Sequence, residues 1–270
     1  MRLSWLAKPF TNLWAHRQLA ARLILRDILG KYRGSFVGVL WSLLNPLLML
    51  AIYSFMFSIV FKARGTTSEA TGGGFAVFLF VGMIMHGLLA DCIGRGPSII
   101  VGNSSYVKKV VFPIDILPWV ALGTALFNAV IGFIVLLGAI LLSRRGVPWT
   151  AVYFPFILLP LLLGAVGIMW FLSAVGVYIR DIGQLTSFVS TMLLYLSPVL
   201  YPVSALPLNL QFWMRLNPLS FVIEQGREVL LVGHQPDWIG LIVYTFVGGV
   251  IAIAGYGTFQ SLRKGFADVI

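Results

Sequence analysis

The side chains that could do chemistry in this sequence are few and lie far apart. The three histidines, His16, His86 and His234, fall in three different segments, and no carboxylate or cysteine stands beside them at the spacing of a metal site. His86 and Asp91 are close enough along one helix to carry protons, although Asp91 could equally be an interfacial carboxylate beside Arg95. These residues therefore predict neither a metal centre nor a catalytic site.

A phosphate-binding loop is missing as well. No G-x-x-x-x-G-K-[ST] run occurs in the 270 residues, so the chain has no loop of this kind to hold the phosphates of ATP. The single cysteine, Cys92, excludes an intrachain disulfide. We expect no cofactor on this chain, and any ATP-driven function would need another subunit.

The composition explains why reactive groups are rare. Hydrophobic residues make up 59% of the chain, charged residues 10%, and the mean hydropathy is +0.94, whereas a soluble domain has roughly 25% charged residues. The formal net charge of +10 is not gathered in a basic cluster, and no nucleic-acid motif accompanies it. The sequence therefore predicts an integral membrane protein that contacts membrane lipids and does not bind nucleic acid.

Charge-free apolar runs predict the elements that must position the polar residues. A bilayer core of about 30 Å needs about 20 apolar residues per helix. Six runs approach that length, and the second and fifth are short enough that they could extend into flanking residues. We therefore predict an all-α domain over residues 37–270 with six transmembrane helices, at 37–61, 75–90, 116–142, 152–177, 185–200 and 238–259.

The distribution of Lys and Arg predicts the orientation of these helices. Cytoplasmic segments carry an excess of both residues, and most of them precede the first run, follow the last, or lie in the second-to-third and fourth-to-fifth connections. Arg144 and Arg145 favour the opposite orientation, but the first helix usually dominates. Both termini are expected to be cytoplasmic.

Residues 1–36 are expected to form a cytoplasmic or interfacial helix and a loop before the first span. An apolar stripe recurs there at helical spacing, with three arginines on another face, which favours a helix lying in the membrane interface. A helix packed against protein on two sides is the alternative. The stripe consists of Trp14, Ala21, Leu25, Ile28 and Tyr32.

The connection before the last apolar run, residues 202–237, is also expected to be structured. Pro207 and Pro218 divide it into two short apolar pieces, and proline is typical of helix starts and breaks. The pattern predicts a pair of short or re-entrant external helices between the fifth and sixth spans.

Three motifs, in this order, resemble one family. RDILGKYRGSFVGVLWSLLNPLL, KKVVFPIDILP and VYIRDIGQL are similar to segments of the permease subunits of ABC-2 exporters, which move lipid-linked O-antigen, capsule or teichoic acid. The resemblance covers nearly the whole chain. It implies a homodimer in the bacterial inner membrane, with two copies of an ABC ATPase that bind ATP and Mg²⁺. The form of the second motif is closer to O-antigen and teichoic acid exporters than to capsule exporters.

The resemblance also gives a role to the polar loop GNSSYVKKVVFPIDILPW, residues 102–119. Permeases of this family place a short helix there that docks on the ATPase, with a second contact in the next cytoplasmic connection. Two of its residues, Lys108 and Lys109, could instead serve only to keep the loop cytoplasmic. The implied docking residues are Ser105, Tyr106, Val107, Lys108, Lys109, Arg180 and Asp181.

A channel between two protomers, lined largely by the first and fifth helices, is implied in the same way. Aromatic side chains with a polar handle could slide along sugar rings there, although anchoring in the membrane interface is the simpler role for most aromatics. The candidate channel residues are Trp41, Tyr53, Phe188, Tyr195 and Tyr201.

Basic residues near the first span are candidates for contact with the lipid carrier. Arg26, Lys31 and Arg33 could attract the diphosphate of a polyprenyl-linked glycan, and they could also be there only for topology. The family often has Leu-Gly before the first span, and this chain has Val37-Gly38, which is the implied gate.

The favoured function is therefore that of a non-enzymatic permease in an ATP-driven exporter of lipid-linked polysaccharide, with O-antigen as the first candidate. Capsule and teichoic acid are alternative substrates. An ion-coupled secondary transporter is the alternative from another class, and it would be favoured by intramembrane charges or by broken helices repeated in two halves. The sequence contains neither pattern.

Overall fold

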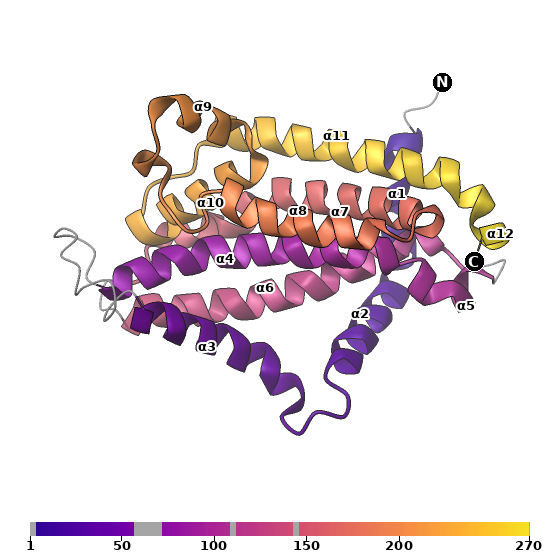
Figure 1. Ribbon diagram of the computed structural model, residues 1–270, viewed down its shortest axis with the longest axis horizontal. Helices are drawn as coiled ribbons and strands as arrows, with labels where there is room; N and C mark the ends of the chain where they lie inside the picture. The colour runs from indigo at the N-terminus through magenta and orange to yellow at the C-terminus, as the bar shows by residue number, and fades with distance from the viewer. Residues whose placement is uncertain (1–3, 57–71, 109–111, 143–145, 270) are drawn as a thin grey trace.

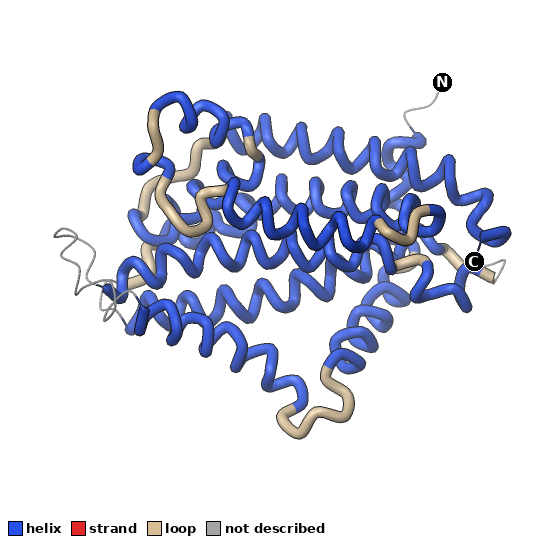
Figure 2. Tube along the Cα trace, viewed as in Figure 1, coloured by secondary structure: helices blue, strands red, loops and turns tan. Residues whose placement is uncertain are grey.

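The computed structural model describes residues 4–56, 72–108, 112–142 and 146–269. Every regular element in these ranges is helical (Figure 2), which confirms the all-α prediction. The long helices run roughly side by side along the longest axis of the molecule (Figure 1). They are α3 (Trp41–Phe55), α4 (Gly72–Arg95), α6 (Leu117–Leu142), α7 (Phe154–Tyr178), α8 (Ile182–Leu196) and α11 (Trp238–Leu262).

Five stretches of the described chain are long and apolar enough to cross a membrane, so the protein is a multi-pass membrane protein. They are Gly38–Phe55, Gly74–Ser98, Ile114–Leu142, Trp149–Tyr178 and Trp238–Gly265. The stretch Gly74–Ser98 continues beyond the predicted apolar run 75–90 and includes Asp91 and Arg95. This extension was expected because the run itself was short for a span.

The helix of the expected fifth span begins and ends earlier than its apolar run at 185–200, and like that run it is short for a span. α8 has 15 residues, about 22 Å at the rise of an α-helix, against a bilayer core of about 30 Å. It ends because Ser197, which precedes Pro198, is extended, as sterics favour for a residue before proline. The prediction of six spans is thus confirmed for five, and α8 is a shorter apolar helix.

Glycines set the close packing of α7 against α11. A Cβ atom added to Gly167 would lie 2.5 Å from the carbonyl oxygen of Ile251, and one added to Gly248 would lie 2.6 Å from that of Pro160. A Cβ on Gly255 would overlap the carbonyl oxygen of Gly167. Small residues of this kind let membrane helices approach closely, so these two helices form the tightest pair in the described bundle.

An aromatic cluster joins the beginning of α6 to α7 and α11. The ring of Trp170 is fully buried and contacts Trp119 and Tyr256 edge-on, with centroids 5.5 and 5.1 Å apart. The indole Nε1 of Trp170 donates a hydrogen bond of 3.1 Å to the carbonyl oxygen of Asp115. Edge-on pairs of this kind add to the energy of burial and fix how these helices meet.

The N-terminal segment forms two helices in place of the single one predicted. α1 (Ser4–Ala15) and α2 (Arg17–Lys31) meet at His16. The buried residues of α2 are Ala20, Leu23 and Ile28. Ala20 and Leu23 pack against Ile116, just before α6, and against Val120 of α6. Of the predicted stripe, Ile28 is thus buried, whereas Trp14 and Leu25 are 72% and 57% exposed. The face that packs against the bundle coincides only in part with the stripe, and the interfacial placement of α2 stays a prediction.

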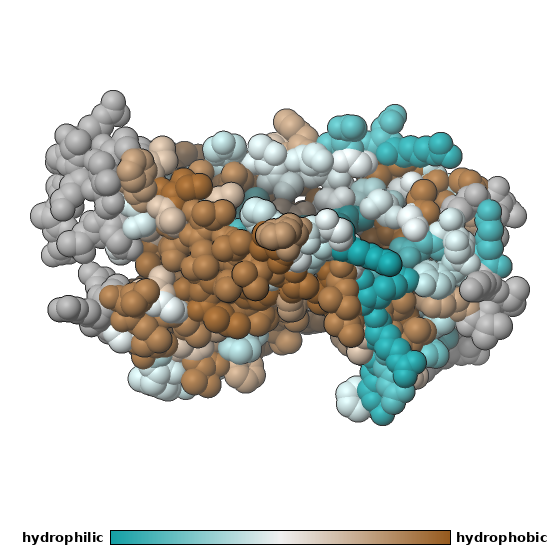
Figure 3. All heavy atoms as spheres, turned by 90° about the horizontal axis from the view of Figure 1, so that it is seen from below, coloured by the Kyte–Doolittle hydropathy of each residue, from teal (hydrophilic) through white to brown (hydrophobic). Residues whose placement is uncertain are grey.

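The two ends of the bundle differ. α1, α5 (Ser104–Val107) and α12 (Phe266–Val269) lie at one end, and α9 (Leu208–Leu216) lies at the other with the beginning of α10 (Pro218–Arg227) (Figure 1). Pro207 directly precedes α9 and Pro218 begins α10, which confirms the prediction of two short helices. Seen from below, the bundle surface is largely apolar, and hydrophilic side chains gather toward the end where α2 lies (Figure 3).

Candidate docking, gate and channel surfaces

The predicted docking loop belongs to a run of short helical turns between α4 and α6. In the described residues these are η4 (Gly96–Ser98), η5 (Val101–Asn103), the single-turn helix α5 and η6 (Ile114–Ile116). Ser105 and Lys108 are exposed, whereas Tyr106 and Val107 are half-buried and face the protein. Lys109 lies outside the described residues. The surface that α5 offers to a partner is therefore formed by Ser105 and Lys108.

Close backbone contact fixes this loop to α7. A Cβ on Gly96 would lie 2.8 Å from that of Leu172, and a Cβ on Gly176 would overlap the backbone of Pro97. The second predicted contact, Arg180-Asp181, is exposed just beyond the end of α7. Because η4 packs on that end of α7, the structure brings both predicted docking segments to the same end of the bundle.

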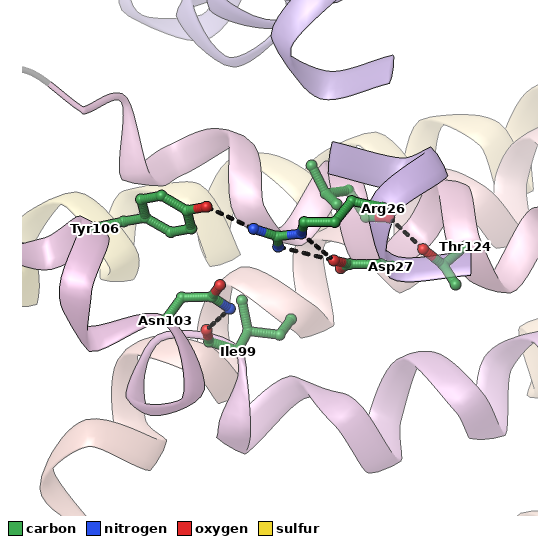
Figure 4. A network of polar contacts seen from close by, with 7 residues as sticks. Arg26, Asp27, Ile99, Asn103, Tyr106 and Thr124 are labelled. Carbon is green, nitrogen blue, oxygen red and sulfur yellow. Dashed lines mark hydrogen bonds and ion pairs between the residues drawn. The ribbon is translucent and has the colours of Figure 1, made fainter. Parts of the chain in front are cut away.

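Arg26 connects α2 to the docking helix (Figure 4). Its Nη1 atom donates a hydrogen bond of 2.5 Å to the hydroxyl of Tyr106, and its Nε and Nη2 atoms contact the Asp27 carboxylate at 3.1 and 2.8 Å. The hydrogen bond to Asp27 raises the pKa of Arg26 above its usual value, so the guanidinium is charged. The Tyr106 ring in turn stacks on Phe112, with centroids 4.4 Å apart. A residue predicted to contact the lipid diphosphate thus touches one predicted to dock the ATPase.

The other predicted gate residues lie between α2 and α3. Lys31 ends α2 and lines a cavity beneath α4 and α6, and Arg33 is exposed in the turn that follows. Val37 is half-buried, and Gly38 has a φ of +59°. L-residues with a side chain rarely adopt this angle, which explains the glycine at the entry to α3.

The predicted channel residues lie on two separate helices, α3 and α8, and in the segment that follows α8. α4 packs against both α3 and α8. On α8, Phe188 and Tyr195 are 64% and 62% exposed on one face, and the hydroxyl of Tyr201 donates a hydrogen bond of 2.8 Å to the Tyr195 carbonyl oxygen. Trp41 is partly exposed on α3, whereas Tyr53 lines the cavity toward α4. In this chain Tyr201 therefore meets Tyr195, whereas the aromatics of α3 and those of α8 lie on different helices that both pack against α4.

The ABC-2 type transporter family matches residues 18–231 of this chain. The chain belongs to that family. It is 28% identical over 261 residues to an O-antigen export system permease of Myxococcus xanthus, covering 96% of this chain and 98% of the relative. An O-antigen export system permease of Klebsiella pneumoniae is 24% identical over 91% of this chain and 92% of its own. A polysialic acid transport protein of Escherichia coli is 25% identical, and the alignment covers 87% of this chain and 91% of that protein.

This ABC-2 protein contains a buried carboxylate that the sequence reasoning did not single out. Asp115 is 4% exposed, and its Oδ2 atom accepts hydrogen bonds from Asn12 Nδ2 at 2.7 Å and from the Tyr256 hydroxyl at 3.4 Å. It thereby joins α1 to α11 beside the Trp170 cluster. The sequence did contain a signal for this site, because Asp115 is a single acidic residue inside the apolar FPIDILP run. A carboxylate buried there needs hydrogen-bond partners.

A buried arginine holds the opposite end of the ABC-2 bundle together. Arg227 is 5% exposed, and its guanidinium donates to the carbonyl oxygens of Phe78, Pro198 and Val199 at 3.2, 2.6 and 2.9 Å. Its Cζ lies 3.5 Å from the centroid of the Phe78 ring. Burial lowers the pKa of Arg227, which lies outside the five spans, to about 9, so it remains charged at pH 7. Arg227 connects α10 to α4 and to the break after α8.

The possible proton pair of this ABC-2 chain does not form. His86 Nε2 lies 3.0 Å from the carbonyl oxygen of Ser190 in α8. Asp91 instead contacts Arg95 Nε at 2.8 Å and Asn128 Nδ2 at 3.4 Å. The two side chains point to different neighbouring helices, so the simpler interpretation of Asp91, a carboxylate paired with Arg95, is the one the geometry supports.

Proposed function

We propose that this chain is the membrane subunit of an ATP-driven exporter that moves a lipid-linked polysaccharide, with O-antigen as the first candidate. The observation that carries the proposal is the family match over residues 18–231 together with O-antigen export permeases that align over almost the entire chain. The polysialic acid transport relative makes a capsule polysaccharide the second candidate substrate.

In this proposal the end that carries α1, α5 and α12 faces the cytoplasm of a bacterial inner-membrane protein. Hydrophilic side chains gather toward this end (Figure 3), and basic residues of α2 lie there, in agreement with the excess of Lys and Arg in cytoplasmic segments. α9 and α10 then lie on the outer side, where α10 packs against α4 and α9 packs against α10.

The proposed assembly is a homodimer with two ATPase subunits, which bind ATP and Mg²⁺. α3 and α8 support it, since both present exposed apolar faces (Trp41, Leu48, Ile52, Phe55, Phe188, Met192 and Tyr195 among them). A second copy that covers part of these faces would place the aromatics of both helices around one path for the glycan. Ser105, Lys108, Arg180 and Asp181, all exposed at the cytoplasmic end, are the proposed contacts for the ATPase.

The test reverses two charges at the proposed docking surface. Lys108→Glu with Lys109→Glu should prevent co-purification of the ATPase and abolish polymer export, because like charges then face the partner. Lys264→Glu is the matched control, since Lys264 is also exposed at this end but outside the docking loop. Normal co-purification and export by the double variant would contradict docking through this loop.

Reconstitution separates the exporter from a secondary transporter. Liposomes that contain this chain alone should not translocate a lipid-linked glycan, and activity should appear only when the ATPase and ATP are added. Transport by the chain alone that follows an imposed proton or sodium gradient would contradict the exporter proposal.

A further inference from the structure

The buried carboxylate of Asp115 has no part in the proposed docking, gate and channel surfaces. Asp115 lies in η6, where the chain returns from the docking loop into α6. Its main-chain carbonyl oxygen accepts the hydrogen bond from Trp170 Nε1 of α7. Because glycines let α7 and α11 pack closely together, the main chain at Asp115 is held by a tightly packed part of the bundle.

The side chain of Asp115 reaches α1. Its Oδ2 atom accepts a hydrogen bond of 2.7 Å from Asn12 Nδ2, and the Tyr256 hydroxyl of α11 donates to the same atom over a longer distance of 3.4 Å. The ring of Phe10 adds an edge-on contact with Trp119, with centroids 5.6 Å apart. One polar contact and one aromatic contact therefore join α1 to the beginning of α6.

The next helix, α2, touches the docking loop as well. Arg26 Nη1 donates a hydrogen bond to the Tyr106 hydroxyl of α5 (Figure 4). The N-terminal arm, by which we mean α1 and α2 together, thus contacts the segment between α4 and α6 at two places, one from each helix. A single contact would let the arm pivot, whereas two contacts on separate helices fix both its position and its direction.

An apolar cluster also joins the arm to this segment. Its buried members are different from those of the main core of the bundle. Because close-packed side chains transmit a displacement and do not absorb it, a movement of the docking loop passes to the arm. The cluster consists of Ala20, Leu23, Ile116 and Val120, with Leu13, Leu19, Ile24, Tyr106 and Phe112 packed against them.

The arm leads directly to the predicted gate. α2 ends at Lys31, and the turn that contains Val37 and Gly38 connects it to α3. We propose that Asp115 is a positioning residue for export: through Asn12 it holds the arm to the docking loop, so that an ATPase that displaces the loop also moves the arm and the beginning of α3. The inference rests on the proposed function, since it requires an ATPase that acts on this loop.

The test measures the polymer exported per ATP hydrolysed by the full-length chain reconstituted with its ATPase. Asn12→Leu has a side chain of similar volume but no donor for the Asp115 carboxylate. It should lower this ratio at least fivefold, while the ATPase still co-purifies and hydrolyses ATP within twofold of the wild-type rate. Thr11→Leu is the matched control, because Thr11 is exposed on the same helix, and it should leave the ratio unchanged.

Exchanging the two partners tests whether the hydrogen bond itself matters. The double variant Asn12→Asp with Asp115→Asn keeps one amide and one carboxylate at this contact, so an N–H···O bond can form in the opposite direction. Its ratio of export to ATP hydrolysis should lie within twofold of the wild-type value. A ratio as low as that of Asn12→Leu would contradict the proposal, because the contact would then be restored without effect.

Spin labels measure the coupling without any polymer. In a Cys92→Ala background, Gln18→Cys and Val101→Cys place labels at exposed positions of α2 and η5. The distance between the labels should stay constant when ATP is added to the complex. In Asn12→Leu the distance distribution should widen on addition of ATP, because the arm then pivots about Arg26.

Two further results would overturn the proposal. One is that Asn12→Leu exports as much polymer per ATP as Thr11→Leu, and the other is that the label distances of Asn12→Leu and the wild type respond to ATP alike. Failure of the wild-type complex to export polymer with ATP would instead contradict the proposed function, and the label distances would still test this inference. Should Asn12→Leu not yield a monodisperse protein, Asn12→Ala provides the same comparison with a smaller side chain.

Discussion

Replacing Arg227 with methionine should destabilise the protein at the end that carries α9. The guanidinium donates hydrogen bonds to three main-chain carbonyl oxygens, one on α4 and two in the break after α8. Methionine is of similar length and can fill much of the volume, but it donates nothing. Arg227→Met therefore leaves three carbonyl groups without this donor while it largely preserves packing.

The expected loss follows mainly from two of those acceptors, because the carbonyl oxygen of Phe78 lies inside α4 and keeps its hydrogen bond within the helix. Leaving a buried polar group unsatisfied costs about 1 to 3 kcal/mol, and we take about 1 to 1.5 kcal/mol for each of the Pro198 and Val199 carbonyls because they lie near one end of the bundle. The free energy of unfolding should fall by about 2 to 3 kcal/mol, and Tm by roughly 5 to 10 °C for a chain of this size. The Tm of Arg227→Lys should lie between those of the wild type and Arg227→Met, since one ammonium group cannot contact all three oxygens in the same geometry.

Cys92 provides the assay. It is the only cysteine, it is 1% exposed, and it lies on α4, the helix that Arg227 contacts through Phe78. A thiol-reactive fluorogenic dye therefore reports unfolding of the detergent-solubilised protein as temperature rises. Arg22→Met, at an exposed position of α2, is the control and should change Tm by less than about 2 °C. If Arg227→Met unfolds within about 2 °C of the wild type, the three hydrogen bonds do not stabilise this end.

Three further predictions use variants with matched controls. Gly255→Ala should lower the free energy of unfolding by about 1 to 3 kcal/mol in the same dye assay, because its Cβ would overlap the backbone of α7. The control, Gly249→Ala, has nothing within 4 Å of the added Cβ and should be neutral or slightly stabilising. Equal effects of the two variants would refute close packing through Gly255. Tyr106→Phe removes the hydrogen bond to α2, worth about 1 kcal/mol, so amide exchange in α2 should quicken roughly fivefold while that in α9 stays constant. Tyr195→Ala should lower polymer export without lowering Tm. Phe246→Ala, at a similarly exposed aromatic position on α11 (72% against 62% for Tyr195), should leave export unchanged if α8 lines the path.

Local patterns in the sequence were sufficient for most of the helices. A long charge-free run must be a helix in a bilayer because its backbone groups can be satisfied only internally, and this alone predicted α4, α6, α7 and α11. Prolines predicted α9 and α10, since proline breaks one helix and readily begins the next. The fifth run was placed a few residues too late, at 185–200 instead of Ile182–Leu196. Its end was missed although Pro198 was visible, because hydropathy was given more weight than the restriction on Ser197.

The connections between these helices could not be predicted in the same way. Asp115 meets Tyr256 across 141 positions, Arg227 meets Phe78 across 149, and Arg26 meets Tyr106 across 80. A charged residue in an apolar run indicates that a polar partner is needed, but which residue is the partner depends on which helices become neighbours. For the same reason the apolar stripe of α2 did not reveal which face is buried.

The sequence by itself therefore determined the class of this protein, the stretches that are long and apolar enough to cross a membrane, and the family motifs, because hydrophobicity, proline and short motifs act over a few neighbouring residues. Only the tertiary structure decided that Tyr106 turns inward to α2 while Ser105 and Lys108 face outward, and that small residues of α4 and α6 leave a cavity beside Lys31. Side-chain direction and empty volume are properties of several helices packed together, and no single segment contains them.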